Sequence, residues 1–378
     1  ELIKDFFPLE TLKQIDRDAI RNHPQWADWK WQLRNQIRSL EELEQWINVT
    51  DGERRAIEAT NGFFRWRITP YYASLMDPND PNCPIRKQVV PSMDEMEDDI
   101  DLLALDPLEE PAHSPVENVI HNYRDRVAFC VSSICAVYCR YCLRKRMVGE
   151  GENMMNKQGL QEGINYIGDH PEIRDVLLTG GDPLTLSDAN LEWIISRLRA
   201  IPHVEIIRLG SRFPVLNPFR ITDELCRIIS DYHPVWFNTH FNHVKEVTPV
   251  AERYIDKLLR AGSPVGNQTV LLKGINNDAE TLKALFNKLV RIRVRPYYLY
   301  QAQLIGGTRH FRTTIEEGMK IMNQLRGRTS GFAIPLYVLD TPYGKVPLTP
   351  NGFEKRDGDF VVVQAYGGQT WREYNPLQ

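Results

Sequence analysis

The sequence lacks any long hydrophobic run. No stretch approaches the 18 or more apolar residues that a membrane span needs, and no signal peptide is visible. It also lacks a strong excess of one charge, because 46 lysines and arginines stand against 50 aspartates and glutamates, a net charge of −4. A global basic field of the kind that binds nucleic acid is therefore not expected. We predict neither a membrane nor a nucleic acid as a partner.

Cysteine is scarce, and its distribution is informative. The 378 residues include six cysteines, too few and too unevenly spaced for a disulfide framework. Three of them fall within the stretch Cys135-Ala-Val-Tyr-Cys139-Arg-Tyr-Cys142, and the basic run Arg144-Lys145-Arg146 follows. Thiolates in so tight a loop converge on one point, as an iron–sulfur cluster or a zinc ion requires. Such a site indicates a reducing, cytoplasmic setting.

The cysteine loop supplies only three thiols. A cluster held by three cysteines leaves one iron open to a small molecule, and C-x3-C-x2-C matches the signature of the radical-SAM enzymes, whose open iron binds S-adenosyl-L-methionine. The alternatives are a structural zinc ion or three thiols that lie close together by chance. Zinc would require a fourth Cys or His at a paired spacing, and none stands nearby. We therefore predict a [4Fe-4S] cluster on Cys135, Cys139 and Cys142.

The first part of the chain reads as helical. Large apolar residues from Trp26 to Ile47 recur every three to four positions and predict one amphipathic helix. Thr50-Asp-Gly-Glu53 fits the capping box of a second helix. The segment 69–86 is rich in Pro, Asn and Asp and indicates an irregular linker, and the acidic segment 94–106 indicates a solvated helix and loop. Residues 1–120 are thus predicted to form an N-terminal helical extension and linker.

From Arg126 onward strands and helices alternate. The predicted strands are 127–134, 175–179, 204–209, 235–238, 265–272 and 294–300, and the helices that follow them are 160–167, 190–200, 223–232, 251–261, 280–292 and 315–325. Six such units predict an α/β fold with a parallel sheet, and they are too few for a closed eight-stranded barrel. A doubly wound sheet fits the count as well.

The cysteine loop after the first strand favours an open six-unit (β/α)6 partial barrel over residues 121–330. Residues 331–378, with candidate strands at 335–339 and 360–365, are predicted to be a small C-terminal extension.

Polar residues follow the ends of successive strands. In parallel α/β folds the carboxyl ends of the strands carry the chemistry. The residues at those ends, strand by strand, are Thr179-Gly180-Gly181-Asp182, Gly210-Ser211-Arg212, Asn238 to His243, Asn267-Gln268 and Tyr300-Gln301. Each alone could be a turn residue or a hydrogen-bonded buried group, but their recurrence predicts a site at this edge of the sheet.

The motifs together resemble the lysine 2,3-aminomutase family. Besides the cysteine loop, the matching stretches are LLTGGDPL, RLGSRFPV, VWFNTHFNH, VRPYYLYQ and RGRTSG, spread over roughly three hundred residues. The resemblance implies an isomerase that uses a [4Fe-4S] cluster, S-adenosyl-L-methionine and pyridoxal 5'-phosphate, and that moves the α-amino group of an L-amino acid to C3. It also implies a flavodoxin- or ferredoxin-type reductant and a homo-oligomer.

The resemblance also assigns roles to individual residues. Cys135, Cys139 and Cys142 match the cluster ligands, and the residues that match the adenosylmethionine site are Gly180, Gly181, Asp182, His240 and Gln268. Lys345 matches the lysine that carries pyridoxal phosphate as a Schiff base. Arg126 matches a phosphate-binding arginine, although Asn122 stands where the family has a second arginine. Arg144 matches the arginine that holds the substrate carboxylate, which a planar guanidinium suits.

Two departures from the family pattern bear on structure and substrate. The C-terminal cysteines that bind zinc in the lysine enzymes are absent here, so no structural zinc is predicted. Of the two aspartates that receive the side-chain ammonium of lysine, one is replaced by Gln303 and the other is present as Asp340. We predict L-lysine as the substrate and L-β-lysine as the product, with L-arginine and then L-glutamate as the alternatives. A non-mutase radical-SAM methylase or lyase, and an iron–sulfur electron carrier, are the competing functions.

Overall fold

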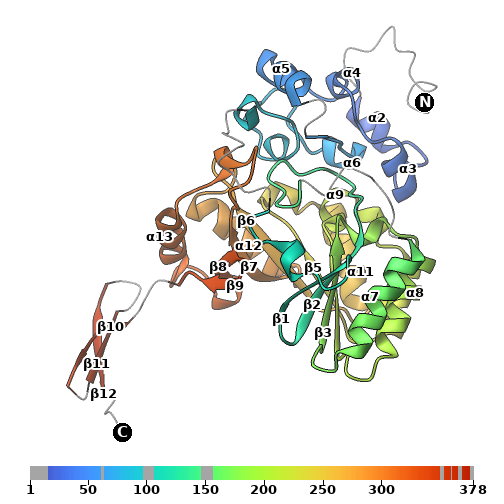
Figure 1. Ribbon diagram of the computed structural model, residues 1–378. Coiled ribbons are helices and arrows are strands. Elements are labelled where there is room, and N and C mark those ends of the chain that lie inside the picture. Colours follow the sequence, from blue (N-terminus) through green and yellow to red (C-terminus); the bar gives the residue numbers. More distant parts are fainter. Residues whose placement is uncertain are drawn as a thin grey trace.

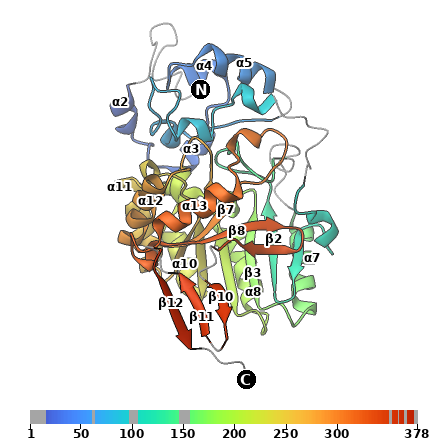
Figure 2. The ribbon, with the colours of Figure 1, turned by 90° about the vertical axis from the view of Figure 1, so that its left-hand side faces the viewer.

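The computed structural model describes residues 16–60, 64–96, 106–145, 156–349, 353–358, 360–364 and 368–374. Short helices of the N-terminal part lie over one end of a large sheet, and longer helices pack outside that sheet (Figure 1). A small separate sheet of β10 (Phe353–Asp357), β11 (Phe360–Gln364) and β12 (Thr370–Tyr374) lies near the opposite end (Figure 2). Among the described residues, no helix has the length and hydrophobicity that crossing a membrane requires.

The main sheet contains nine strands, which are neighbours in chain order. They are β1 (Val119–Tyr123), β2 (Arg126–Ser132), β3 (Asp175–Gly180), β4 (Ile206–Gly210), β5 (Val235–Thr239), β6 (Val265–Leu271), β7 (Arg295–Gln301), β8 (Leu336–Thr341) and β9 (Gly344–Pro347). Strands β2 to β8 run parallel, while β1 and β9 pair antiparallel at the two edges. The predicted α/β class is confirmed, and the sheet is mixed.

Each of the six central strands is followed by a helix, as the sequence predicted. The helices are α7 (Lys157–Asp169), α8 (Asp188–Arg199), α10 (Asp223–Asp231), α11 (Pro249–Arg260), α12 (Ala279–Arg291) and α13 (Ile315–Leu325). Each begins after an Asn, Ser, Thr or Asp whose side chain accepts a hydrogen bond from a main-chain N–H of the first turn. The predicted helix starts lie within a few residues of the observed ones.

Alternation along β3 shows how the sheet separates its two faces. Val176 and Leu178 are fully buried in the layer beneath the helices, whereas Asp175, Leu177 and Thr179 point to the other face and line a cavity. Burying each such aliphatic side chain contributes about 1.5–3 kcal/mol. The apolar residues therefore hold the sheet against its helices, and the inner face is left for polar side chains.

The two edges of the main sheet nearly meet. Asn122 of β1 donates from Nδ2 to the main-chain oxygen of Pro342 at 2.9 Å, and the Tyr123 hydroxyl accepts from the Lys345 main-chain N–H at 2.7 Å. Gly344 has φ = +109°, and a Cβ there would lie 3.0 Å from the Tyr123 ring. These are side-chain contacts rather than a strand ladder. The predicted open barrel is thus more exactly a nearly closed partial barrel of nine strands.

The segment predicted as a C-terminal extension is divided between two sheets. Strands β8 and β9 belong to the main sheet, because β8 pairs with β7 and buries Tyr337 and Val338. Only β10 to β12 form a sheet of their own. The separation of 331–378 from the barrel is therefore wrong for β8 and β9, because local sequence does not show that β8 pairs with β7 and β9 with β8. The predicted boundary between the N-terminal extension and the barrel, at residues 120 and 121, stays a prediction.

The single helix predicted from Trp26 to Ile47 is wrong. The structure has two short helices there, α3 (Trp29–Arg34) and α4 (Leu40–Glu44). Between them Ile37 leaves helical geometry and forms an antiparallel bridge with Ile68, and Ser39 starts α4 with its own capping box. The capping box predicted at Thr50 and Glu53 is confirmed at the start of α5 (Asp51–Thr60). Another short helix, α2 (Arg17–Arg21), precedes them.

Two N-terminal segments are more buried than their composition predicted. The supposed linker contains the helix α6 (Pro70–Ala73), whose four residues are all buried. In the acidic segment, Glu95 lies in the 3-10 helix η2 (Met93–Met96) and is fully buried, so the prediction of a solvated segment is wrong there. The rest of that prediction, 97–105, lies outside the described residues. Composition alone cannot reveal a charge that has a buried partner.

Candidate active site

The cysteine loop follows β2 at the carboxyl edge of the sheet. Cys135, Cys139 and Cys142 all line one small pocket of about 50 Å³, whose other lining residues include Arg140 and Lys145. Burial raises the pKa of the Cys142 thiol to about 11, and the neighbouring Cys139 adds to the rise. Burial likewise raises the pKa of Cys135, with Cys142 as the next contribution. Three thiols gathered this closely need positive charge before all can ionise.

The donor set fits an iron–sulfur cluster. No group of three or more His, Cys, Asp and Glu side chains in the described part of the chain is gathered around a single ion position. The three thiols nevertheless line one pocket, and their C-x3-C-x2-C spacing in the sequence is typical of an iron–sulfur cluster loop. Iron bound here would supply the positive charge that balances three thiolates, and cysteine sulfur is the ligand type that iron–sulfur clusters take.

A larger cavity of about 480 Å³ lies on the inner face of the nearly closed barrel. Seven of the residues predicted to form the site line it, together with Asn122: Arg126, Arg144, His240, Gln268, Gln303, Asp340 and Lys345. Asp175 and Thr179, at opposite ends of β3, both line it as well. The cavity therefore runs along the inside of the barrel, and is not confined to the carboxyl ends of the strands as predicted.

Lys345 reaches this cavity from β9. Its Nζ lies 3.2 Å from Asp340 Oδ2, and 5.8 Å from the ring centroids of both Tyr123 and Tyr300. The side chains of Lys345 and Asp340 are 29% and 16% exposed, so the ammonium and the carboxylate face each other in a largely enclosed space. A lysine nitrogen that opens into such a cavity can, as the free amine, attack the carbonyl group of a bound molecule.

Comparison with known proteins identifies the family of this site. The model of the Radical SAM superfamily matches residues 129–286, and that of Lysine-2,3-aminomutase matches residues 322–376. The L-lysine 2,3-aminomutase of Clostridium subterminale is 47% identical over 93% of this chain and 85% of its own length. The enzyme of the same name from Bacillus subtilis is 47% identical over 97% and 78%. The chain belongs to the lysine 2,3-aminomutase family.

Membership confirms the predicted resemblance and makes the protein an isomerase of the aminomutase kind. The Radical SAM superfamily implies a [4Fe-4S] cluster and S-adenosyl-L-methionine. The family is not uniform in its substrates, because a glutamate 2,3-aminomutase of Clostridioides difficile is 44% identical over 91% of this chain and 82% of its own length.

Arg144 lies near the cysteine loop and points into the cavity. Its Nε and Nη2 donate to Glu110 at 3.0 and 2.8 Å, while Nη1 contacts, among the described residues, only Thr179 Oγ1 at 3.3 Å and the Gly180 oxygen at 3.5 Å. One edge of the guanidinium is thus occupied by Glu110, and the other is loosely held. That second edge has the geometry to accept a carboxylate.

The glycines of the predicted adenosylmethionine motif have a structural function in this chain. A Cβ at Gly180 would lie 2.2 Å from the Ser132 oxygen, and one at Gly181 would lie 2.5 Å from the Ile134 oxygen. Larger residues would therefore displace the backbone that leads into the cysteine loop. Asp182 lies outside the large cavity; its carboxylate is buried and accepts from the main-chain N–H groups of Leu184 and Arg212. Burial raises the pKa of Asp182 to about 6.

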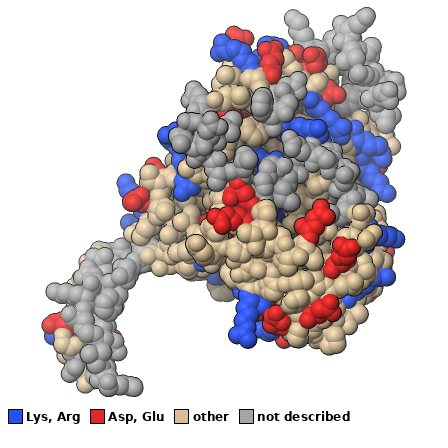
Figure 3. Space-filling model, in the orientation of Figure 1, with Lys and Arg blue, Asp and Glu red and all other residues tan. Residues whose placement is uncertain are grey.

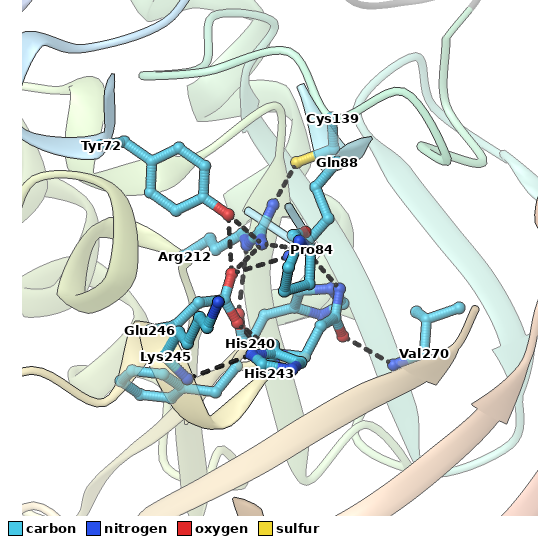
Figure 4. A network of polar contacts seen from close by, with 12 residues as sticks. Tyr72, Pro84, Gln88, Cys139, Arg212, His240, His243, Lys245, Glu246 and Val270 are labelled. Atoms are coloured by element: carbon cyan, nitrogen blue, oxygen red, sulfur yellow. Dashed lines mark hydrogen bonds and ion pairs between the residues drawn. The ribbon is translucent and has the colours of Figure 1, made fainter. Parts of the chain in front are cut away.

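The wall behind His240 is a buried polar network (Figure 4). Tyr141 stacks on His240 with ring centroids 5.8 Å apart, and its hydroxyl lies 3.0 Å from Nε2. Burial, followed by the charge of Arg212, lowers the pKa of His240 well below its usual value, so the imidazole is neutral near pH 7. Arg212 itself bonds Glu246 at 2.8 Å. A neutral His240 can accept or donate a hydrogen bond without adding charge beside the cluster pocket.

Sequence reasoning missed several residues of the site. Glu110, Tyr141 and Arg208 line the large cavity, and Arg208 Nε lies 2.7 Å from Asp175 Oδ1. The alternation of β4 could have identified Arg208, because it lies two residues before Gly210 on the inner face. Glu110 carried no such signal, since its 3-10 helix reaches Arg144 only through the tertiary fold.

A buried ion-pair network holds the cysteine loop. Glu95 from the N-terminal part accepts from Arg140 at 2.5 Å and from Lys145 at 3.1 Å, and all three side chains are at most 8% exposed. Burial alone would raise the pKa of Glu95, but the two cations lower it to about 2. Arg140 also donates to the main-chain oxygen of Arg65 at 3.0 Å. One carboxylate thus holds the residues on either side of Cys142, at the C-terminal end of the cysteine loop.

Glu95→Gln is expected to destabilise the fold by about 3–5 kcal/mol, because it leaves two buried cations with a neutral partner. Urea unfolding would measure the loss. Glu205→Gln is the control, since Glu205 pairs with Arg174 where both side chains are more than half exposed, and little change is expected. Equal effects of the two substitutions would contradict the assigned role of Glu95.

Proposed function

We propose that this chain is a radical-SAM, pyridoxal-phosphate-dependent 2,3-aminomutase that converts L-lysine into L-β-lysine. The observation that carries the proposal is the single cavity that contains Lys345, Asp340 and Arg144 together. The Lys345 amine can attach pyridoxal phosphate, the Asp340 carboxylate can attract a cationic side chain, and the Arg144 guanidinium can bind the substrate carboxylate. We also propose a flavodoxin- or ferredoxin-type reductant and a homo-oligomeric state.

The residues around Lys345 fit pyridoxal 5'-phosphate. The rings of Tyr123 and Tyr300 each lie 5.8 Å from the Lys345 amine, and the Arg126 guanidinium stacks 3.8 Å from the Tyr123 ring centroid. Arg126 and Arg208 can supply the positive charge that a phosphate needs, which compensates for the asparagine at 122. When bound, pyridoxal phosphate provides the π-system through which the migrating nitrogen can pass.

Arg144 would orient the substrate through its carboxylate. The hydrogen bonds from Nε and Nη2 to Glu110 fix the guanidinium plane. Nη1, beside Thr179, can then donate to the substrate carboxylate. A carboxylate held there places the α- and β-carbons at a constant position in the cavity. The Cys135, Cys139 and Cys142 cluster would supply the electron that cleaves adenosylmethionine, and His240 and Gln268 would line its binding site.

Asp340 favours a cationic substrate. It now pairs with Lys345, but it loses that partner once the lysine nitrogen is engaged with pyridoxal phosphate. The Gln303 amide nitrogen donates to the Asp340 main-chain oxygen at 2.8 Å, so its amide oxygen is left available. One carboxylate and one amide oxygen attract an ammonium or guanidinium group, whereas an anionic side chain would be repelled. This ranks L-lysine first, L-arginine second and L-glutamate third.

The test of the function is an anaerobic assay of the reconstituted, reduced enzyme on L-lysine, L-arginine and L-glutamate. Mass spectrometry of the derivatised products would detect each β-isomer. We expect L-β-lysine as the main product. Formation of β-glutamate alone would contradict the cationic substrate, and absence of every β-isomer from an enzyme with an intact cluster would contradict the aminomutase function.

Asp340→Asn is expected to raise KM for L-lysine by about 10- to 100-fold, because a hydrogen bond to a charged group contributes about 1.5–3 kcal/mol. Steady-state kinetics would measure it. Gln303→Ala is the comparison and should have a smaller effect, since an amide oxygen lacks the full charge. Unchanged KM in the Asp340 variant would show that this carboxylate does not bind the substrate side chain.

A further inference from the structure

Arg212 is buried directly against one of the proposed cluster ligands. It follows β4 as the residue before the short helix α9 (Phe213–Leu216), and its main-chain N–H donates to Asp182 at 2.9 Å. Its side chain is 8% exposed. The guanidinium Nη1 lies 2.7 Å from Cys139 Sγ (Figure 4). The contact is between a permanent cation and a thiol that the family uses as a ligand.

The other two nitrogens of Arg212 fix the direction of this contact. Nη2 donates to Gln88 Oε1 at 2.7 Å and to Glu246 Oε1 at 2.8 Å, and Nε donates to the main-chain oxygen of His240 at 3.1 Å. A guanidinium is planar, so bonds to two of its nitrogens determine where the third points. Gln88, Glu246 and His240 thus aim Nη1 at the Cys139 sulfur.

Glu246 does not depend on Arg212 alone. It is fully buried and accepts from the Tyr72 hydroxyl at 2.7 Å, and from the main-chain N–H groups of Asn242 and His243 at 2.6 and 2.9 Å. These neutral donors stabilise the carboxylate independently. The Glu246 carboxylate therefore does not neutralise Arg212 exclusively. The charge of Arg212 is available to the Cys139 sulfur as well.

We propose that Arg212 is a positioning residue that stabilises the reduced cluster through its N–H···S hydrogen bond to Cys139. The inference rests on the proposed cluster. In the step concerned, a low-potential reductant gives one electron to the cluster, whose core changes from 2+ to 1+, and no bond forms or breaks. Added negative charge spreads onto the cysteine sulfurs, so a buried cation and hydrogen bond at one of them favour the reduced state and raise the reduction potential.

The charged surroundings make the direction of the effect clear. The described face in Figure 3 carries scattered side chains of both signs, whereas Arg212 lies in the interior, where solvent does not screen it. Glu246 opposes the effect, but its carboxylate bonds the guanidinium through Nη2, while the sulfur is bonded through Nη1. The nearer charge dominates, so loss of Arg212 should make the cluster harder to reduce.

The test is an anaerobic dithionite titration of the reconstituted protein without adenosylmethionine, followed by electron paramagnetic resonance. Arg212→Gln with Glu246→Gln removes both charges and leaves no lone buried carboxylate. In this double variant we expect the equilibrium constant for one-electron reduction of the cluster to fall at least about tenfold. That fall corresponds to a shift of the reduction potential by about 59 mV in the negative direction. Arg212→Lys keeps the charge and should shift less.

The matched control is Arg86→Gln with Glu53→Gln. Arg86 and Glu53 also form a buried pair, at 2.5 Å with side chains 1% and 14% exposed, and the other bonds of Arg86 go to main-chain oxygens of Asn48 and Pro78. The reduction potential of the cluster in this control variant should equal that in the parent protein.

Three outcomes would overturn the role of Arg212: an unchanged potential in the double variant, an equal shift in the control, or loss of the cluster from both Arg212 variants. A parent protein that takes up no [4Fe-4S] cluster would instead refute the proposed function. Iron and sulfide content, measured on every sample, separates the two results.

Discussion

Each of the substitutions Cys135→Ala, Cys139→Ala and Cys142→Ala is expected to abolish the iron–sulfur absorbance or its reactivity, and with it all turnover. The physical reason is that the three thiols share one pocket, and no other cysteine lines it. A cluster missing one of three protein ligands exposes a second iron and is lost or inactivated. Anaerobic reconstitution followed by iron and sulfide analysis and visible absorbance would measure the loss.

The remaining cysteines provide the controls for this experiment. Cys83 and Cys130 are buried, Cys226 is half-buried, and none of them lines the cluster pocket. Cys226→Ala, Cys83→Ala and Cys130→Ala should each retain the cluster with little loss. Iron content that survives in the Cys139 variant and falls in the Cys226 variant would refute the assignment of the ligands.

Lys345→Arg is expected to eliminate both the covalent attachment of pyridoxal phosphate and the aminomutase activity. Arginine keeps the positive charge beside Asp340, but a guanidinium cannot form the Schiff base that a lysine amine forms. Borohydride reduction of the loaded enzyme, followed by peptide mass spectrometry, should place the adduct on Lys345 in the parent protein and on no residue in the variant.

The control for this prediction is Lys320→Arg, an exposed lysine on α13. It should bind pyridoxal phosphate and isomerise the substrate as the parent does. An adduct on a lysine other than Lys345, or full activity of the Lys345 variant, would refute the proposed linkage. Cluster content should be equal in all three proteins, because Lys345 lies in the large cavity and does not line the cysteine pocket.

The carboxyl edge of the sheet was predictable because local rules decide it. Strands and helices each leave their own period of apolar residues in the sequence, so the six units could be located to within a few residues. The gathering of three thiols in one pocket was predictable because the three cysteines lie close together in sequence. The family motifs then suggested Lys345, Asp340, Arg144 and Gln268, all of which line the same cavity.

The partners of buried charges were not predictable. Glu95 was interpreted as part of a solvated acidic segment, yet it pairs with Arg140, which follows it by 45 residues. Glu110 binds Arg144 across 34 residues, and Arg212 reaches Cys139 across 73. Nothing in the local sequence separates an acidic residue that water solvates from one that a distant cation neutralises, because the two differ only in tertiary surroundings.

The sequence by itself determined the alternation of strands and helices, the close spacing of the three cysteines and membership of the aminomutase family. These depend on residues a few positions apart, or on motifs long enough to identify relatives. Only the tertiary structure decided that β8 and β9 complete the sheet, that Tyr123 and Asn122 bring its edges together, and that Arg212 points at Cys139. The reason is physical: such contacts form between segments that are far apart in the chain, and their geometry is fixed by packing rather than by local conformational preference.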